Sequence, residues 1–229
     1  MFVGHIGAGL AVKRFEPRLN LGALLFAALF ADLLLWVLVA LGIESVGVPE
    51  TTGAGRFFTF DFPVSHGLAA SILWSALAAA AGWFLSAPAA PRRWKLASAL
   101  ALAVFSHFAL DLVVHVPDLP VVGAASPKLG LGLWRHMAIA LTLELLFAGG
   151  ALLLYLRSAR LSRPRSFLAA GTVAVAAALT ATGPYLPGEP PPPGVLALSS
   201  LATLAVIVLL GFVIEGGYRA HEDRQRGMV

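Results

Sequence analysis

The fold of this chain is decided by stretches such as residues 94–116, which read WKLASALALAVFSHFALDLVVHV. At a rise of about 1.5 Å per residue, a helix over this range is roughly 34 Å long and crosses the ~30 Å hydrocarbon core of a bilayer. Its side chains are predominantly apolar, as the lipid environment requires of a spanning helix. The stretch therefore predicts a transmembrane helix.

The composition of the whole chain agrees with a membrane protein. Of its 229 residues, 59% are hydrophobic and only 12% are charged, whereas about a quarter of the residues of a soluble domain are charged. We therefore expect a single integral membrane domain over residues 1–229. The chain has no cysteine, which excludes disulfides, thiol catalysis and cysteine-ligated metal sites. Its net charge of +4 does not indicate a nucleic-acid partner, because the basic residues are not gathered on one soluble face.

Six predominantly apolar segments, each bounded by charged residues, Pro or Gly, predict an all-α bundle of six transmembrane helices. They cover residues 21–43, 63–85, 94–116, 137–156, 166–186 and 194–218. Residues 1–12 are also apolar and compatible with a helix, but they are too few to cross a bilayer alone. We expect this segment to be either an interfacial helix or a re-entrant half-helix that dips into the bundle.

The distribution of Lys and Arg predicts the orientation of the helices. Thirteen of the sixteen basic residues lie in the N-terminal turn, the second loop, the fourth loop and the C-terminal tail, and the other three are Arg56, Lys128 and Arg135. Because cytoplasmic loops are rich in Lys and Arg, this alternation places both termini in the cytoplasm. We expect a multi-pass protein of a bacterial-type inner (plasma) membrane.

The loops expected on the outer side differ in length and composition from the basic ones. Residues 44–62 carry four Phe, and residues 117–136 are rich in Pro and Gly, so these loops are expected to cap a site on the outer face. The proline run in residues 187–194 predicts a stiff polyproline turn, to which we assign no chemistry. The five Trp residues lie mostly near helix ends and are interpreted as interface anchors.

Ionisable side chains inside the predicted spans mark the candidate functional site, since each of them is costly in lipid. Counted along the helices, they fall in one layer, at roughly 16 to 26 Å from the cytoplasmic side of the ~30 Å core. Residues from four helices can form a buried metal site or a proton relay only if they lie at the same depth in the membrane. The residues are Asp32, His66, His107, Asp111 and Glu144.

The third predicted span carries the sharpest local signal, the sequence SHFALD at residues 106–111 followed by His115. Spacings of four residues put His107, Asp111 and His115 on one face of a helix. Imidazole and carboxylate ligands together suit Zn²⁺, Mn²⁺ or Fe²⁺. An Asp that only orients a His would give the same pattern, and His115 is near enough to the outer surface to face water.

These residues predict a divalent metal site, with zinc or manganese as the expected ion. The preferred ligands are His66, His107 and Asp111, with His5 as an outer ligand. Asp32 is expected to be a fourth ligand or the general base. Glu144 is expected to be a general base, a partner of a ligand or a structural hydrogen-bond acceptor. For His5 and His66 the alternative is an ordinary interfacial histidine at a helix end.

The order of these residues resembles that of the YdjM-like family of membrane-bound proteins, which are described as metal-dependent hydrolases. The shared pattern is an N-terminal His, an Asp in the next helix, a Ser/Thr-His pair opening the following helix, and Ser-His-x-x-x-Asp. The likeness covers about residues 1–135. It implicates His5, Asp32, His66, His107 and Asp111. The His-x-x-x-Asp element is also similar to that of zinc-dependent phospholipase C enzymes.

The chain departs from this family pattern at two places. It reads ADLL at residues 31–34 where the family usually has Pro-Asp-x-Asp, so one carboxylate is missing. It reads DFPVSHG at residues 61–67 where the family often has His-Arg-Gly before Thr-His-Ser. A smaller ligand set would hold one metal where relatives hold two, or would be a degenerate site.

Three functions are compatible with this pattern. We expect a membrane-embedded hydrolase in which the metal activates water against a lipid-linked or amphipathic ester or phosphoester. The alternative is a proton- or cation-coupled transporter that uses the same buried His/Asp layer. A third reading is a non-catalytic membrane partner whose buried polar residues only fix helix register. The expected partners are the lipid bilayer and a lipid-like substrate, and the sequence does not predict the oligomeric state.

Overall fold

The computed structural model describes residues 2–47, 50–52, 55–86 and 92–225. The expected all-α class is confirmed, since this described part is mainly helical and its strands are short antiparallel pairs. The α-helices are α1 (Phe2–Phe15), α2 (Leu21–Ala28), α3 (Phe30–Ala40), α4 (Leu68–Phe84), α5 (Arg93–Val114), α6 (Met137–Ser158), α7 (Arg163–Thr182) and α8 (Pro193–Gln225). The 3-10 helices are η1 (Leu133–His136) and η2 (Gly183–Tyr185). The strand pairs are β1 (Ser45–Val46) with β4 (Phe60–Asp61), β2 (Glu50–Thr52) with β3 (Gly55–Phe57), and β5 (Leu119–Pro120) with β6 (Lys128–Leu129).

Several long apolar helices are consistent with a membrane protein. Among the described residues, four helical segments are long and apolar enough to cross a bilayer: α5, η1 with α6, α7 with η2, and α8 as far as Gly216. A fifth is added if α2 and α3, which meet at 55°, count as one broken span. α4 is apolar but has only 17 residues, because residues 63–66 form turns where its first turn was expected.

The helix expected over residues 21–43 is interrupted at Leu29. Leu29 has φ −99° and ψ 5°, outside the helical range, and α3 begins at the next residue. The carbonyl of Ala28, the last residue of α2, accepts a hydrogen bond from Nδ1 of His107 at 2.8 Å. Because the last carbonyls of a helix lack partners within that helix, the break provides an acceptor inside the bundle for a side chain of α5.

The α1 helix lies inside the bundle, where it packs against α6, α2 and α5. Val3, His5 and Ile6 are almost fully buried. At Gly7 an added Cβ would lie 2.9 Å from the Cα of Ala148 in α6, so this glycine permits a close approach of the two helices. Of the two alternatives for residues 1–12, the structure favours the half-helix that enters the bundle, although Met1 itself lies outside the described residues.

Two hydrophobic clusters fix the positions of the helices that carry ionisable residues. The larger one joins α1, α2, α6, α7 and α8 and includes Leu10, Leu25 and Leu204. Another joins α3, α5 and the loops around the strands, and it includes Phe62 and Phe108. These two clusters hold α1, α3 and α5 in place around the polar residues that lie between the three helices.

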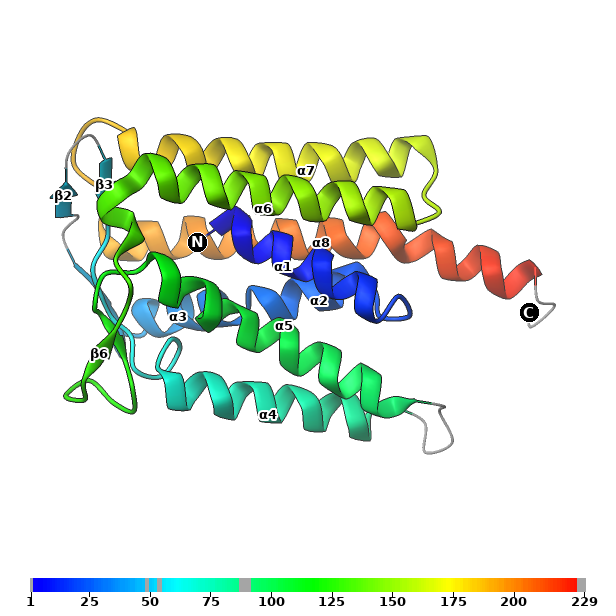
Figure 1. Cartoon of the computed structure of the whole chain (residues 1–229), viewed down its shortest axis with the longest axis horizontal. Helices are drawn as coiled ribbons and strands as arrows, with labels where there is room; N and C mark the ends of the chain where they lie inside the picture. Colours follow the sequence, from blue (N-terminus) through cyan, green and yellow to red (C-terminus); the bar gives the residue numbers. More distant parts are fainter. Residues whose placement is uncertain (1, 48–49, 53–54, 87–91, 226–229) are drawn as a thin grey trace.

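The two ends of the bundle differ in character (Figure 1). The turn between α1 and α2, the turn between α6 and α7 and the end of α8 lie at one end, and the strands lie at the other. The first end carries the basic residues of these turns, among them Arg14 and Arg160. This arrangement agrees with the charge alternation in the sequence, to which Arg226, outside the described residues, also contributes.

Candidate metal centre

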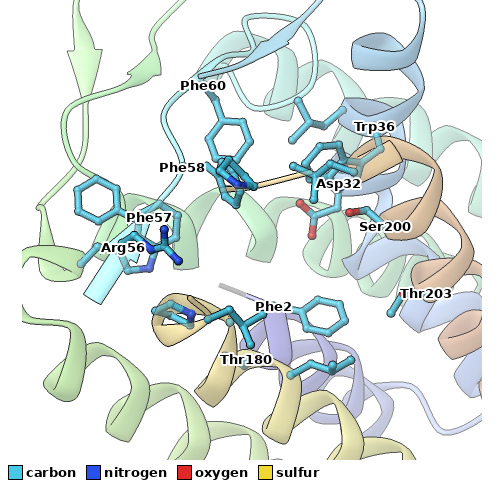
Figure 2. A pocket seen from close by; sticks show the side chains of 18 of the residues that line it. Phe2, Asp32, Trp36, Arg56, Phe57, Phe58, Phe60, Thr180, Ser200 and Thr203 are labelled. Carbon is cyan, nitrogen blue, oxygen red and sulfur yellow. The ribbon is translucent and has the colours of Figure 1, made fainter. Parts of the chain in front are cut away.

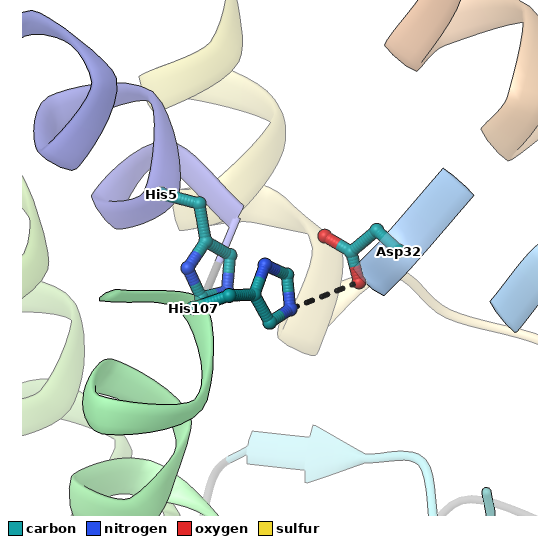
Figure 3. Close-up of side chains that lie close together, drawn as sticks. All are labelled: His5, Asp32 and His107. Carbon is teal, nitrogen blue, oxygen red and sulfur yellow. Dashed lines mark ion pairs between the residues drawn. The ribbon is translucent and has the colours of Figure 1, made fainter. Parts of the chain in front are cut away.

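Four segments of the chain bring ionisable side chains together. α1 supplies His5, α3 supplies Asp32, α5 supplies His107 and Asp111, and the turn before α4 supplies His66. Figure 3 shows His5, Asp32 and His107 converging from separate helices. The side chain of Asp32 is 21% exposed, and the other four residues are buried. The structure thus gathers the four sequence-predicted ligands and Asp32 into one cluster.

The nitrogen and oxygen atoms of this cluster are spaced like ligands of a metal. Nε2 of His107 lies 3.1 Å from Nε2 of His66 and 3.2 Å from Oδ2 of Asp111. Oδ1 of Asp32 lies 3.6 Å from Nε2 of His66 and 3.7 Å from Nε2 of His107. Two ligands about 2.0–2.1 Å from a tetrahedral zinc lie roughly 3.3–3.4 Å apart. The observed separations therefore fit ligands of a single ion.

The hydrogen bond to Ala28 determines which nitrogen of His107 carries its proton. A backbone carbonyl can only accept a hydrogen bond, so Nδ1 of His107 is the donor in its 2.8 Å contact with the Ala28 oxygen. In the neutral ring, Nε2 then carries a lone pair. This lone pair is directed toward His66 and Asp111.

A chain of hydrogen bonds orients His66 in the same way. The Ser65 hydroxyl donates to Oε2 of Glu44 at 2.6 Å, and the same carboxylate accepts the backbone N–H groups of Val64 and Ser65. Because the hydroxyl proton is used, the Ser65 oxygen accepts from Nδ1 of His66 at 2.8 Å. Nε2 of His66 therefore also carries a lone pair. Glu44 is buried, and its partner serine is buried with it.

Two imidazole lone pairs consequently face each other at 3.1 Å. Such an arrangement is repulsive unless a cation lies between the two nitrogens, and two carboxylates border the same space. Metal-binding histidines characteristically donate their second N–H to a carbonyl, a carboxylate or a similar acceptor, which fixes the ring. His66 and His107 both follow this pattern, so the donor set fits a divalent metal.

His5 is the member of the cluster with an unused nitrogen. Its ring is stacked on that of His107, with centroids 3.6 Å apart and planes at 11°. Nε2 of His5 lies 3.1 Å from Oδ1 of Asp111, while Nδ1 is buried and has no hydrogen-bond partner in the described part of the chain. The position of His5 inside the bundle is inconsistent with an ordinary interfacial histidine.

Glu144 is near this cluster but is used differently. It is buried in α6, and its Oε1 accepts the backbone N–H of Gly4 at 3.0 Å. This bond fixes the first turn of α1, the turn that carries His5. Of the three roles expected for Glu144, the structural hydrogen bond is the one visible in its contacts, although the side chain also borders the adjoining cavity.

His115 is buried rather than in contact with bulk water. Its Nδ1 lies 3.0 Å from Oδ1 of Asp118, its Nε2 lies 3.8 Å from Oδ1 of Asp111, and its ring packs against that of Trp134 at 4.0 Å. The expectation that His115 faces water was therefore wrong. The loop after α5, which the sequence predicted to cap a site, folds back over the end of the helix, where the N–H groups of Leu131 and Gly132 donate to the carbonyls of Leu112 and His115.

A cavity of about 750 Å³ adjoins the metal centre (Figure 2). Its polar wall contains Asp32, His66, Asp111, His115 and Glu144. Most of the remaining wall is aromatic or aliphatic, with Trp36, Phe57, Phe58, Phe60, Phe62 and Trp134 among the lining residues. Trp36 and Trp134, which the sequence suggested as interface anchors, are thus part of the cavity wall.

Sequence reasoning missed several residues of this region. The polyproline turn, to which the sequence assigned no chemistry, borders the cavity through residues 187–191, and its Gly188 oxygen accepts a hydrogen bond from Arg56. Glu44, which orients His66 through Ser65, was not singled out either. Ser65 belonged to the expected Ser/Thr-His pair, but its link to Glu44 had no local signal, because Glu44 is 21 positions from Ser65 and meets it only in the fold.

Comparisons with known proteins add no family to this description. The chain matches no family model, no curated protein and no solved structure.

Proposed function

We propose that this protein is a membrane-embedded metal-dependent hydrolase. The observation that carries the proposal is the pair of Nε2 lone pairs of His66 and His107, 3.1 Å apart and bordered by two carboxylates. Nitrogen and carboxylate ligands suit zinc or manganese. The resemblance of the residue order to the YdjM-like family supports the same class of activity.

The ligands and the base have distinct positions in this proposal. His66, His107 and Asp111 hold the metal, and His5 supports Asp111 through the 3.1 Å contact between Nε2 and Oδ1. Asp32 is the general base, because its carboxylate is partly exposed and borders both the cavity and the two imidazoles. A metal held there would supply Lewis-acid chemistry, lowering the pKa of a coordinated water to about 7. Asp32 borders the same space and is placed to accept a proton from a water molecule.

The cavity indicates an amphipathic substrate. Its volume of about 750 Å³ lies within the range of roughly 300–1,000 Å³ typical of small-molecule sites. An aromatic wall beside an ionic wall suits a molecule with an apolar part and an ester or phosphoester group. We therefore propose a lipid-linked or amphipathic ester or phosphoester as the substrate.

We also propose six membrane crossings, with α2 and α3 forming one broken span and α4 a short one. The basic turns lie at one end of the bundle and the strands at the other (Figure 1). Under the positive-inside rule, the basic end is cytoplasmic, as are both termini. The membrane is then the inner (plasma) membrane, with the cavity nearer its outer face.

Elemental analysis of the purified full chain tests the metal. We expect stoichiometric zinc or manganese in the wild type and in His136→Ala, a control at an exposed histidine that does not border the centre. Asp111→Ala should lose the metal, and His66→Ala serves as a second variant if Asp111→Ala does not fold. Absence of metal from the wild type after growth and purification without chelators would contradict the proposal.

An activity assay tests the hydrolase directly. Wild-type protein in detergent, loaded with zinc or manganese, should release product from at least one lipid ester or phosphoester, and Asp32→Asn should retain the metal but lose turnover. A carrier is the alternative, because the facing lone pairs could also bind a proton. Wild-type proteoliposomes that show pH-gradient-dependent flux, without turnover of any ester class, would favour the carrier over the hydrolase.

A further inference from the structure

A second pocket lies at the basic end of the bundle, among the turn after α1, the turn after α6 and α8. It has a volume of about 130 Å³. This is far more than the ~10–15 Å³ that a single water needs, so the pocket accommodates a small polyatomic group. Its polar lining comprises Lys13, Arg14, Tyr155, Ser158, Arg160 and Glu215.

The only carboxylate lining this pocket, among the described residues, is already neutralised. Oε2 of Glu215 accepts from Nζ of Lys13 at 2.7 Å and from the backbone N–H of Leu21 at 2.9 Å, and Oε1 accepts from the Tyr155 hydroxyl at 3.0 Å. Lys13 also donates to the carbonyls of Pro17 and Leu19. The ammonium and the carboxylate therefore satisfy each other and their neighbours, and they leave the pocket no net negative charge.

Two guanidinium groups supply the remaining charge. Arg14 comes from the end of α1 and Arg160 from the turn after α6, and both are exposed. In the described part of the chain, neither forms an ion pair or a side-chain hydrogen bond. The nearby carboxylate of Glu16 is engaged by Arg18 at 2.7 and 2.8 Å. Two cations from different turns thus border one pocket with no counter-ion supplied by the described protein.

We propose that this pocket binds a phosphate group, carried either by an anionic phospholipid head group or by free phosphate. Guanidinium groups present paired N–H donors that match phosphate oxygens. Basic pockets between helices on the cytoplasmic side of a membrane protein are where acidic lipid head groups bind. The site is separate from the metal centre and does not depend on the proposed hydrolase.

The test is phosphate binding by the full chain in neutral detergent. Purified protein is titrated with short-chain phosphatidylglycerol, with phosphatidylcholine of the same chain length and with inorganic phosphate at constant ionic strength. Native mass spectrometry counts bound ligand. The double variant Arg14→Gln/Arg160→Gln removes the pocket cations, and Arg157→Gln/Arg163→Gln removes the same charge from neighbouring positions that do not line the pocket.

The expected result is saturable binding that falls at least about tenfold in the pocket variant and less than about threefold in the control. Saturation by phosphatidylglycerol alone identifies the lipid head group as the source, and saturation by inorganic phosphate identifies the free anion. Equal loss in both variants would show general surface attraction and overturn the proposal. Absence of saturable binding in the wild type, or undiminished binding in the pocket variant, would overturn it as well.

Discussion

In the described part of the bundle, two buried ionic clusters differ in how completely their polar atoms are paired. Around Glu215, donors and acceptors match: an ammonium, a phenol and a backbone N–H donate to the two carboxylate oxygens. Around His107, two imidazole lone pairs face each other and a nitrogen of His5 has no partner within the described residues. Buried polar groups in proteins normally have hydrogen-bond partners. The first cluster therefore stabilises the fold, and the second has the character of a binding site.

The largest effect should follow removal of His107. We expect His107→Ala to abolish metal binding, because His107 belongs to both groups of side chains that could hold an ion, one with His5 and Asp32 and one with His66 and Asp111. A chelator should lower the thermal unfolding midpoint of the metal-loaded wild type by about 10 °C and leave that of His107→Ala unchanged. Differential scanning fluorimetry with and without chelator measures both. An equal chelator effect on the two proteins would contradict the assignment of the His107 cluster as a metal site.

The next effect concerns the matched cluster. Glu215→Gln should lower the free energy of unfolding by about 3 kcal/mol, because it leaves the ammonium of Lys13 without its charged partner in a largely buried site. Metal content should stay at the wild-type level. Denaturant unfolding in detergent, combined with elemental analysis, checks both statements. Loss of metal from Glu215→Gln would show that the two clusters are not independent.

Glu44 offers a way to sharpen the description of the metal centre. Glu44→Gln should weaken metal affinity by about 10–100-fold, because it disturbs the hydroxyl that fixes the ring of His66 without removing a ligand. Competition with a metal-binding dye gives the affinity. Glu189→Gln is the control, since Glu189 borders the cavity and forms no hydrogen bond or ion pair with the imidazoles among the described residues. Identical affinities for Glu44→Gln and the wild type would mean that His66 does not need this support.

The smallest effect is expected at the ion pair between the buried Glu16 and the half-exposed Arg18. The hydrogen bond from Arg18 holds the pKa of Glu16 below its ordinary value of 4.5, so the pair stabilises the fold above that pH and loses its contribution as the pH falls through the folded-state pKa. Because Arg18 is 48% exposed, solvent screening limits the effect to less than about 1 kcal/mol. Glu16→Gln and the wild type should therefore differ slightly in unfolding free energy at neutral pH and converge in acid. If the difference in unfolding free energy between the two proteins instead grew as the pH fell, the predicted pH dependence would be wrong.

Sequence patterns predicted the helices well where the signal was local. α5 and α6 begin and end within two residues of the ranges expected from apolar length and flanking charge. The interruption at Leu29 was not predictable in this way, because its neighbours Ala28 and Phe30 include neither Pro nor Gly. The break instead accompanies a long-range hydrogen bond between α5 and the end of α2.

In the site, too, local sequence patterns predicted some residues, whereas contacts between distant segments could not be predicted. Four-residue spacing placed His107 and Asp111 together, and the common depth of the polar residues suggested that His66 and Asp32 would join them. The structure brings these residues and His5 into one cluster. Depth alone could not separate Glu144, which bonds to α1, from the ligands. It could not reveal Glu44 either, because that residue lies in a loop outside the predicted spans.

The position of α1 between other helices affects the order in which the protein assembles during synthesis. Gly4 bonds to Glu144, 140 positions further along the chain, so α1 leaves the ribosome long before its main neighbour exists. Until α6 has entered the membrane, α1, which carries His5, cannot take its final position. The polar centre is therefore completed late during synthesis, and nascent chains arrested before Met137 should leave His5 open to a water-soluble, histidine-modifying reagent that cannot reach it in the finished protein.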